Sequence, residues 1–142
     1  MIKGLYHIGV VVNSIDATLE TLNAAFGAVE IGAKGRKTFP EIGQTSALIR
    51  IGDFTLELME PSGDVKGTCT KFLEKRGEGL HHISLLSDDL DADDEHLKSI
   101  KINVLGKTPI DNDGDRVMFT HPKQSAGILF EITQLQEKEG SC

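Results

Sequence analysis

A stretch near the start of the chain recurs 75 residues later, and this repeat constrains the fold more than any other feature. Aligned without a gap, residues 5–22 and 80–97 are identical at seven positions. The identical pairs are Leu5/Leu80, His7/His82, Ile8/Ile83, Asp16/Asp91, Ala17/Ala92, Glu20/Glu95 and Leu22/Leu97. We therefore expect one small structural module that is used twice.

A second repeat lies near the end of each copy. Leu56-Glu57-Leu58 corresponds to Phe130-Glu131-Ile132, which lies 74 residues further along the chain. Each copy thus has one histidine early, His7 or His82, and one glutamate late. Two imidazoles and two carboxylates related by a duplication form a ligand set that suits a single metal ion on the shared axis.

Length and charge limit the possible partners. A chain of 142 residues fits one compact domain. Its apolar content of 39% is ordinary, and no apolar run approaches the roughly 18 to 20 residues that span a bilayer. A net charge of -7 opposes binding to phosphate backbones and to anionic lipids. We expect neither nucleic acid nor membrane as a partner, and Met1-Ile2-Lys3-Gly4 has no signal-peptide character.

The two cysteines, Cys69 and Cys142, do not form a metal or redox motif. One lies in a helical pattern, the other is the last residue, and neither is part of a CxxC motif. This usage is a weak case for a disulfide and favours a reducing, cytoplasmic location.

The first copy predicts a strand followed by a helix. Residues 6–12 form a β-branched run typical of a strand. Ser14 can cap a helix that ends at Gly27. The residues expected on the core face of this helix recur at helical spacing: Ile15, Leu19, Leu22 and Phe26.

Shorter extended runs complete the first copy. A strand is expected over 29–31, followed by a basic loop with Lys34, Arg36 and Lys37. Two runs within 45–59 meet at Gly52-Asp53, which fits a type II′ hairpin turn. A connecting helix is expected over 65–76, with one apolar face formed by Val65, Cys69, Phe72 and Leu73.

The second copy predicts the same order of elements. Its strands are expected at residues 80–86, 102–105, 117–120 and 128–133, with a turn at Asp113-Gly114. The helix over 89–101 is expected to face inward with Leu90, Leu97 and Ile100. The prediction is an α+β fold of two βαβββ modules in one domain: module one at about 1–62, the connecting helix at about 65–77 and module two at about 79–136.

Strand alternation places the four candidate ligands opposite apolar rows. Successive side chains of a strand point to opposite faces, so His7 opposes Ile8 and Val10, and Glu57 opposes Leu56 and Leu58. His82 and Glu131 are placed in the same way in the second copy. His81 points with the core-facing side and is interpreted as structural. A lone strand histidine is usually a core residue, but the repeat favours a metal site.

The ligand types restrict the metal. Two nitrogens and two hard oxygens without a thiolate suit zinc, cobalt, nickel, manganese or iron(II). Four protein ligands would leave two octahedral positions open, which indicates catalysis more than scaffolding.

Several segments resemble the vicinal oxygen chelate superfamily and, within it, the methylmalonyl-CoA epimerases. The segments that carry the resemblance cover nearly the whole chain: 7–9, 56–61, 71–83, 121–123 and 127–131. The most specific is Lys71 to Ile83. The resemblance implies a glyoxalase/bleomycin-resistance-like fold with an open cavity around a metal. It also implies a homodimer and epimerisation of methylmalonyl-CoA, or a similar acyl-CoA, through a metal-stabilised enolate.

The resemblance assigns roles to individual residues. The expected metal ligands are His7, Glu57, His82 and Glu131. Glu131 is also a candidate acid or base. In place of the strand carboxylate that some epimerases use, this chain has Ser46, so a water near Ser46, or Glu41, is the candidate for the second role. Lys123, Arg116 and the basic loop are candidates for binding the coenzyme A phosphates.

Two other classes of function stay open. One is a different metal-dependent reaction, such as glyoxalase I-like isomerisation or extradiol ring cleavage; the other is a non-catalytic module that binds a small ligand. The Asp-rich loop from Ile110 to Arg116 also departs from the epimerase pattern.

Overall fold

The computed structural model describes residues 1–32, 35–108 and 114–136. The chain forms two compact units. The first, called the His7 unit below, is His7–His81, and the second, called the His82 unit, is Met1–Tyr6 together with His82–Cys142. The division falls inside two strands, β1 (Ile2–Val11) and β6 (Gly79–Ser87).

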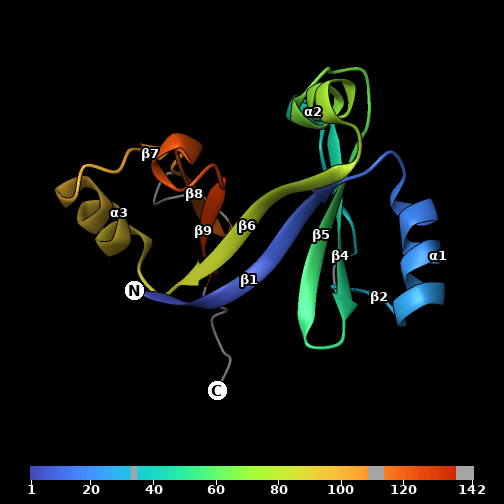
Figure 1. The fold of residues 1–142 in the computed structure, drawn as a ribbon, viewed down its shortest axis with the longest axis horizontal. Helices are drawn as coiled ribbons and strands as arrows, with labels where there is room; N and C mark the ends of the chain where they lie inside the picture. Colours follow the sequence, from blue (N-terminus) through green and yellow to red (C-terminus); the bar gives the residue numbers. More distant parts are fainter. Residues whose placement is uncertain (33–34, 109–113, 137–142) are drawn as a thin grey trace. The chain divides into compact units, whose positions relative to one another are not determined.

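The His7 unit contains the end of β1 and the elements that follow it (Figure 1). These are α1 (Ile15–Phe26), β2 (Val29–Ile31), β3 (Lys37–Phe39), the 3-10 turn η1 (Pro40–Ile42), β4 (Gln44–Ile51), β5 (Phe54–Pro61) and α2 (Thr68–Arg76). The strand order is β2-β4-β5-β1, with β3 on β4. β1 runs parallel to β5, and the other pairs are antiparallel.

The His82 unit repeats this plan. After β6 come α3 (Leu90–Ser99), β7 (Val104–Leu105), β8 (Arg116–Thr120), the 3-10 turn η2 (Pro122–Gln124) and β9 (Phe130–Gln134). The strand order is β6-β9-β8-β7, and β6 runs parallel to β9. Both units thus have the order βαβββ, with β3 as an addition in the first. The strand order leaves β2 and β7 as edges in the described part of the chain, so the sheet is open, and the predicted α+β fold is confirmed.

The internal repeat extends to the starts of two helices. Ser14 precedes α1, and its side chain accepts a hydrogen bond of 3.1 Å from the backbone N of Ala17. Asp89 precedes α3 and accepts a bond of the same length from Ala92. Such N-caps satisfy amide groups that the first helical turn leaves without partners. The predicted cap at Ser14 is confirmed, and the structure adds an equivalent cap at Asp89.

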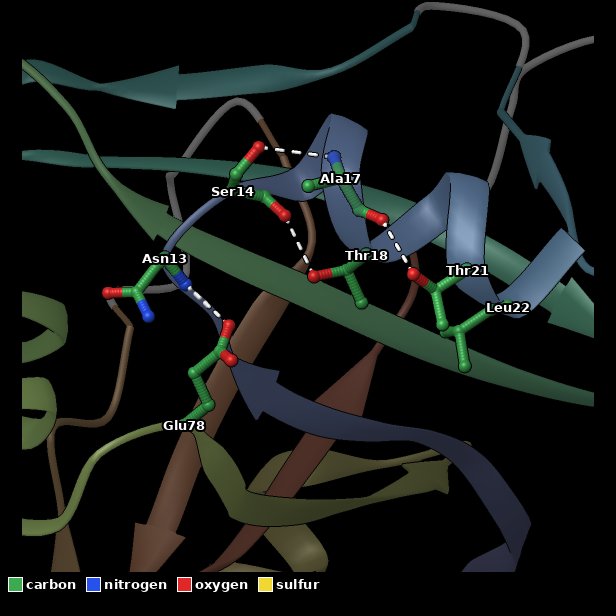
Figure 2. Close-up of a pocket in the computed structure, with 7 residues that line it drawn as sticks. All are labelled: Asn13, Ser14, Ala17, Thr18, Thr21, Leu22 and Glu78. Carbon is green, nitrogen blue, oxygen red and sulfur yellow. Dashed lines mark hydrogen bonds between the residues drawn. The ribbon is translucent and has the colours of Figure 1, made fainter.

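The start of α1 also receives carboxylates from outside the helix. Oε2 of Glu60, on β5, accepts a hydrogen bond of 2.7 Å from the backbone N of Ile15. Oε2 of Glu78 accepts one of 2.9 Å from the backbone N of Asn13, as Figure 2 shows. Negative charge at this end of a helix is favourable because it interacts with the helix dipole.

The main core of the His7 unit lies between α1 and its strands. Its fully buried members include Ile15, Ile49 and Leu58, and Leu19 and Leu22 pack against them. Three of the four predicted core residues of α1 are therefore confirmed. Phe26 is 66% exposed, so the prediction that it lies in the core is wrong. It is the last residue of α1 and has the helical spacing of the core residues, but the packed surface of the sheet does not extend to it.

A second cluster lies on the other face of the same strands. Val11 and Met59 pack with Cys69 of α2, and Phe72 and Leu73 join them. The predicted inward face of the connecting helix is confirmed for these three α2 residues. Val65 is 46% exposed and precedes α2, so that part of the prediction is wrong.

The core of the His82 unit is smaller. It contains Leu90, Met118 and Ile132, with Leu97 and Val104 against them. Ile100 is 53% exposed, contrary to prediction, because α3 ends at Ser99 and the chain turns there.

The hairpin between β4 and β5 has the predicted turn. Gly52 has a φ of 58°, and Asp53 is not among the described residues with positive φ, which is the pattern of a type II′ turn. Three predicted features, Lys34, Asp113 and most of the Asp-rich loop, lie outside the described residues, as does Cys142. No helix in the described ranges is long and apolar enough to cross a membrane.

Candidate functional site: two histidine–glutamate pairs

In the His7 unit, parallel pairing of two strands brings a histidine beside a glutamate. Gly9 of β1 is registered with Glu57 of β5, so His7 lies on the same face, two residues earlier. Nε2 of His7 lies 3.8 Å from Oε2 of Glu57. The histidine is 3% exposed, and the Glu57 side chain is 22% exposed.

The His82 unit repeats this arrangement at the corresponding positions. Ser84 of β6 is registered with Glu131 of β9. Nε2 of His82 lies 4.0 Å from Oε2 of Glu131. His82 is 5% exposed, and the Glu131 side chain is 13% exposed. The duplication that the sequence predicts is therefore present as two equivalent pairs of side chains.

The spacing within each pair suits two ligands of one cation. A hydrogen bond between nitrogen and oxygen has a length of about 2.7 to 3.2 Å, and both pairs are wider than that. Nitrogen and oxygen ligands of zinc-like ions lie about 2.0 to 2.2 Å from the metal. Two ligands on opposite sides of one ion can therefore be up to about 4.2 Å apart, and the separations of 3.8 and 4.0 Å lie within this limit. The donor set fits a divalent cation.

Glu131 is held in place by neighbours on the same face. Oγ1 of Thr133 donates a hydrogen bond of 3.0 Å to Oε1 of Glu131, the oxygen that does not face His82. Thr133 and Ser84 also share a hydrogen bond of 2.9 Å between their hydroxyls, and both residues are buried. The Thr133 hydroxyl thus orients the carboxylate of Glu131, and Ser84 in turn holds Thr133.

The two other acid–base candidates lie in the His7 unit. Ser46 of β4 is 7% exposed and is registered with Met59, two residues after Glu57 on β5. Directly paired residues share a face, so Ser46 lies on the same face as Glu57. Glu41 lies in the turn η1 and is exposed.

The basic residues predicted to bind the coenzyme A phosphates differ in whether they already form ion pairs with carboxylates. Arg116 binds both carboxylate oxygens of Asp91 at 3.0 Å. This contact raises the pKa of Arg116 and holds the pKa of Asp91 well below its usual range. Lys123 lies in η2 and is exposed. In the basic loop, Arg36 pairs with Asp16 and Glu30.

Two further residues, His81 and Cys69, have packing contacts that indicate a structural role. The ring of His81 lies 5.4 Å from that of Phe72, edge to face, in keeping with its predicted structural role. Cys69 is buried, and burial followed by the negative charge of Glu57 raises the pKa of its thiol to about 11. A thiol protonated at neutral pH is a poor nucleophile.

Sequence reasoning missed Gln44. Its side chain contacts Ser46 and also Cys69, which lies 25 residues away in the chain. No local pattern signals such a contact. A shallow surface hollow beside α1 has no link to the predicted site: the charged residue in its lining, Glu78, already accepts a bond from Asn13 (Figure 2).

Comparison with known proteins defines the class. Residues 6–119 match the family model of the glyoxalase/bleomycin resistance protein/dioxygenase superfamily. The chain belongs to this superfamily, as its resemblance to the vicinal oxygen chelate proteins implies.

Several relatives within the superfamily are acyl-CoA epimerases. An ethylmalonyl-CoA/methylmalonyl-CoA epimerase from Cereibacter sphaeroides is 33% identical over 95% of this chain and 100% of its own length. The crystal structure of methylmalonyl-CoA epimerase from Mycobacterium tuberculosis has a TM-score of 0.84 and 26% identity, covering 99% of this chain and 93% of that one. A methylmalonyl-CoA epimerase in complex with methylmalonyl-CoA and NH4+ has a TM-score of 0.82 and 30% identity over 95% and 96% of the two chains. The predicted enzyme class, an isomerase of the epimerase type, is confirmed.

Proposed function

We propose that this protein is a divalent-metal-dependent epimerase of methylmalonyl-CoA or a closely similar acyl-CoA. The observation that carries the proposal is similarity to acyl-CoA epimerases over 95% of the chain and 100% of the relative, in a chain that has two equivalent histidine–glutamate pairs. Ethylmalonyl-CoA, named for that relative, is the nearest alternative substrate.

The proposed cation ligands are His7 and Glu57 from one unit and His82 and Glu131 from the other. Their support is the repeated spacing of the pairs and the chemistry of their donors. When bound, a divalent cation would supply a Lewis acid for the negative charge that develops on the thioester oxygen. Cobalt, nickel, manganese and zinc all suit two imidazoles and two carboxylates, so the metal itself needs measurement.

The chain's own task is to move a proton at the carbon between the thioester and the carboxylate. Epimerisation requires that this proton leave from one face and return on the other. Glu131 is the proposed group for one face, because a hydrogen bond from Thr133 orients its carboxylate. A water near Ser46, or the carboxylate of Glu41, is proposed for the opposite face.

Coenzyme A brings phosphates to an acidic protein, so local positive charge is needed. Lys123 and Arg116 are the proposed contacts. The guanidinium of Arg116 is already shared with Asp91, whereas Lys123 is exposed. Lys123 is therefore the stronger of the two assignments. A homodimer and a cytoplasmic location stay predictions from the family resemblance and from cysteine usage.

Hydrogen exchange tests the proposed reaction. Protein reconstituted with each metal in turn is incubated with methylmalonyl-CoA in heavy water, and label at the carbon between the two carbonyl groups is followed. We expect incorporation that depends on metal and falls after chelation. Wild-type protein that incorporates no label with any metal would contradict the proposal.

The exchange assay, together with assays on other substrates, separates the other candidate functions. A glyoxalase-like isomerase would instead act on a thiohemiacetal, a dioxygenase would consume oxygen with a catechol, and a binding module would do neither. Any of these outcomes without exchange at methylmalonyl-CoA would replace the epimerase assignment.

A further inference from the structure

Three side chains of the His7 unit form a hydrogen-bonded row on the face that carries Glu57. Sγ of Cys69 donates to Oε1 of Gln44 at 3.4 Å, and Nε2 of Gln44 donates to Oγ of Ser46 at 2.9 Å. Cys69 is 1% exposed and Ser46 is 7% exposed. The row thus lies mostly out of water, where hydrogen bonds are electrostatically stronger than in solvent.

The chemistry of the row fixes its direction. A protonated thiol donates, so the carbonyl oxygen of Gln44 faces Cys69. The amide nitrogen of Gln44 then faces Ser46, and because an amide nitrogen can only donate, the serine oxygen accepts. The Ser46 hydrogen is therefore directed elsewhere. Within the described ranges, no residue accepts a hydrogen bond from this hydroxyl.

The register of the strands places this hydroxyl near the proposed site. Ser46 is directly paired with Met59, and Glu57 is the diagonal neighbour on β5. Diagonal neighbours on one face of an antiparallel pair are about 7 to 8 Å apart. The Ser46 hydroxyl therefore lies on the same face as the Glu57 side chain and close to it in the sheet. Unlike a carboxylate, a serine hydroxyl without an adjacent base neither removes a proton nor attacks a carbon.

We propose that Ser46 donates a hydrogen bond to an oxygen of the acyl substrate that becomes more negative as the proton leaves, and that Gln44 is the positioning residue that gives the hydroxyl this direction. The inference rests on the proposed epimerase function. It assigns the Ser46 hydroxyl itself to charge stabilisation and leaves proton transfer on that face to the water or to Glu41. It also gives a role to Gln44, which sequence analysis did not identify.

Two substitutions test the two halves of the proposal. Ser46→Ala removes the donor, and we expect kcat to fall about 100-fold with KM changed little, as for a lost oxyanion donor. Gln44→Glu keeps the shape but replaces the donating nitrogen with an accepting oxygen. Ser46 should then donate to the new carboxylate, so we expect a similar loss of kcat although the hydroxyl is still present.

A double substitution and two controls separate this effect from general damage. In the Ser46→Ala background, Gln44→Glu should cause little further loss, because both changes remove the same hydrogen bond. Ser46→Thr keeps the hydroxyl and should retain most activity. Thr45→Val alters the intervening residue, whose hydroxyl is bonded to Thr38 on the exposed side, and should leave kcat unchanged.

Deuterium exchange at methylmalonyl-CoA with metal-saturated protein is the readout. Loss of exchange in Ser46→Ala and Gln44→Glu, non-additive in the double variant, supports the proposal. This inference alone is overturned if wild type is active and either single variant shows unchanged exchange. It is also overturned if the losses in the double variant are additive. Wild type without exchange overturns the epimerase assignment, and the inference with it.

Discussion

The hydroxyl of Thr133 lies 3.0 Å from Oε1 of Glu131 and donates a hydrogen bond to it, which leaves Oε2 facing His82. Thr133 is also bonded to Ser84 and is 2% exposed. Because Thr133 holds Oε1 of Glu131, the other oxygen, Oε2, has a defined position facing His82.

Replacing Thr133 with valine keeps the shape of the side chain but removes this donor. We expect Thr133→Val to weaken divalent-metal binding about 10- to 100-fold, the usual effect of losing a partner that orients a ligand. Calorimetric titration of metal into chelator-treated protein measures the change. Thr133→Ser retains the hydroxyl and should bind nearly as wild type; equal affinities for the valine variant and wild type would refute the orienting role.

A cluster of opposite charges makes the His82 unit sensitive to acid. Hydrogen bonds from Arg116 and then Lys107 lower the pKa of Asp91, and Lys107 lowers the pKa of Asp94. Since these pKa values are depressed in the folded state, their stabilising effect is present above the unfolded value of about 3.9 and is lost as pH falls through the lower folded values. We expect the free energy of unfolding to decrease from about pH 5 downward.

The variant Arg116→Met tests the source of this dependence. It removes the two bonds to Asp91, so stability should be lower at pH 7 and should change less on acidification than in wild type. Denaturant titrations between pH 7 and pH 3 provide the comparison. Lys71→Met removes an exposed positive charge from α2 and serves as the control. Parallel pH curves for Arg116→Met and wild type would disprove the assignment.

Cys69 should be chemically inert at neutral pH. Burial, followed by the charge of Glu57, raises the pKa of its thiol to about 11, and only the thiolate reacts with alkylating reagents. We expect slow alkylation of Cys69 at pH 7.5 in folded protein, and rapid alkylation after denaturation. Peptide mass spectrometry resolves Cys69 from Cys142. Equal rates for Cys69 in folded and denatured protein would be the contrary result.

Lys123 should interact with the phosphates of coenzyme A through charge alone. Lys123→Glu is expected to raise KM for the acyl-CoA several-fold at low salt, with kcat little changed, and added salt should reduce the difference because exposed charges are screened. Steady-state kinetics at two ionic strengths measure both effects, with Lys71→Glu as the control. A KM that is independent of this charge would remove Lys123 from the site.

Features set by neighbours in the sequence were predictable. The start of α1 follows from Ser14, its end from Gly27, and the II′ turn from Gly52-Asp53, because each depends on residues within a few positions. The core predictions for Phe26 and Ile100 are wrong for a matching reason. Helical periodicity states which residues share a face, but only the packed structure determines how far the covering surface extends.

Contacts between distant residues were not predictable in the same way. The bond from Ile15 to Glu60 joins residues 45 positions apart, and the row through Gln44 joins β4 to α2. The histidine–glutamate pairs were found in advance because the duplication doubled a weak signal. A single His7 would have been interpreted as a core histidine.

The number of divalent ions bound per chain tests the central claim most directly. Chelator-treated protein is reloaded, separated from free metal and analysed for metal and protein content, together with the variants His7→Ala and His82→Ala. A single ion shared by both pairs predicts one ion per chain in wild type and almost none in either variant. Two ions per chain, with one lost in each variant, or no ion at all, would contradict the account.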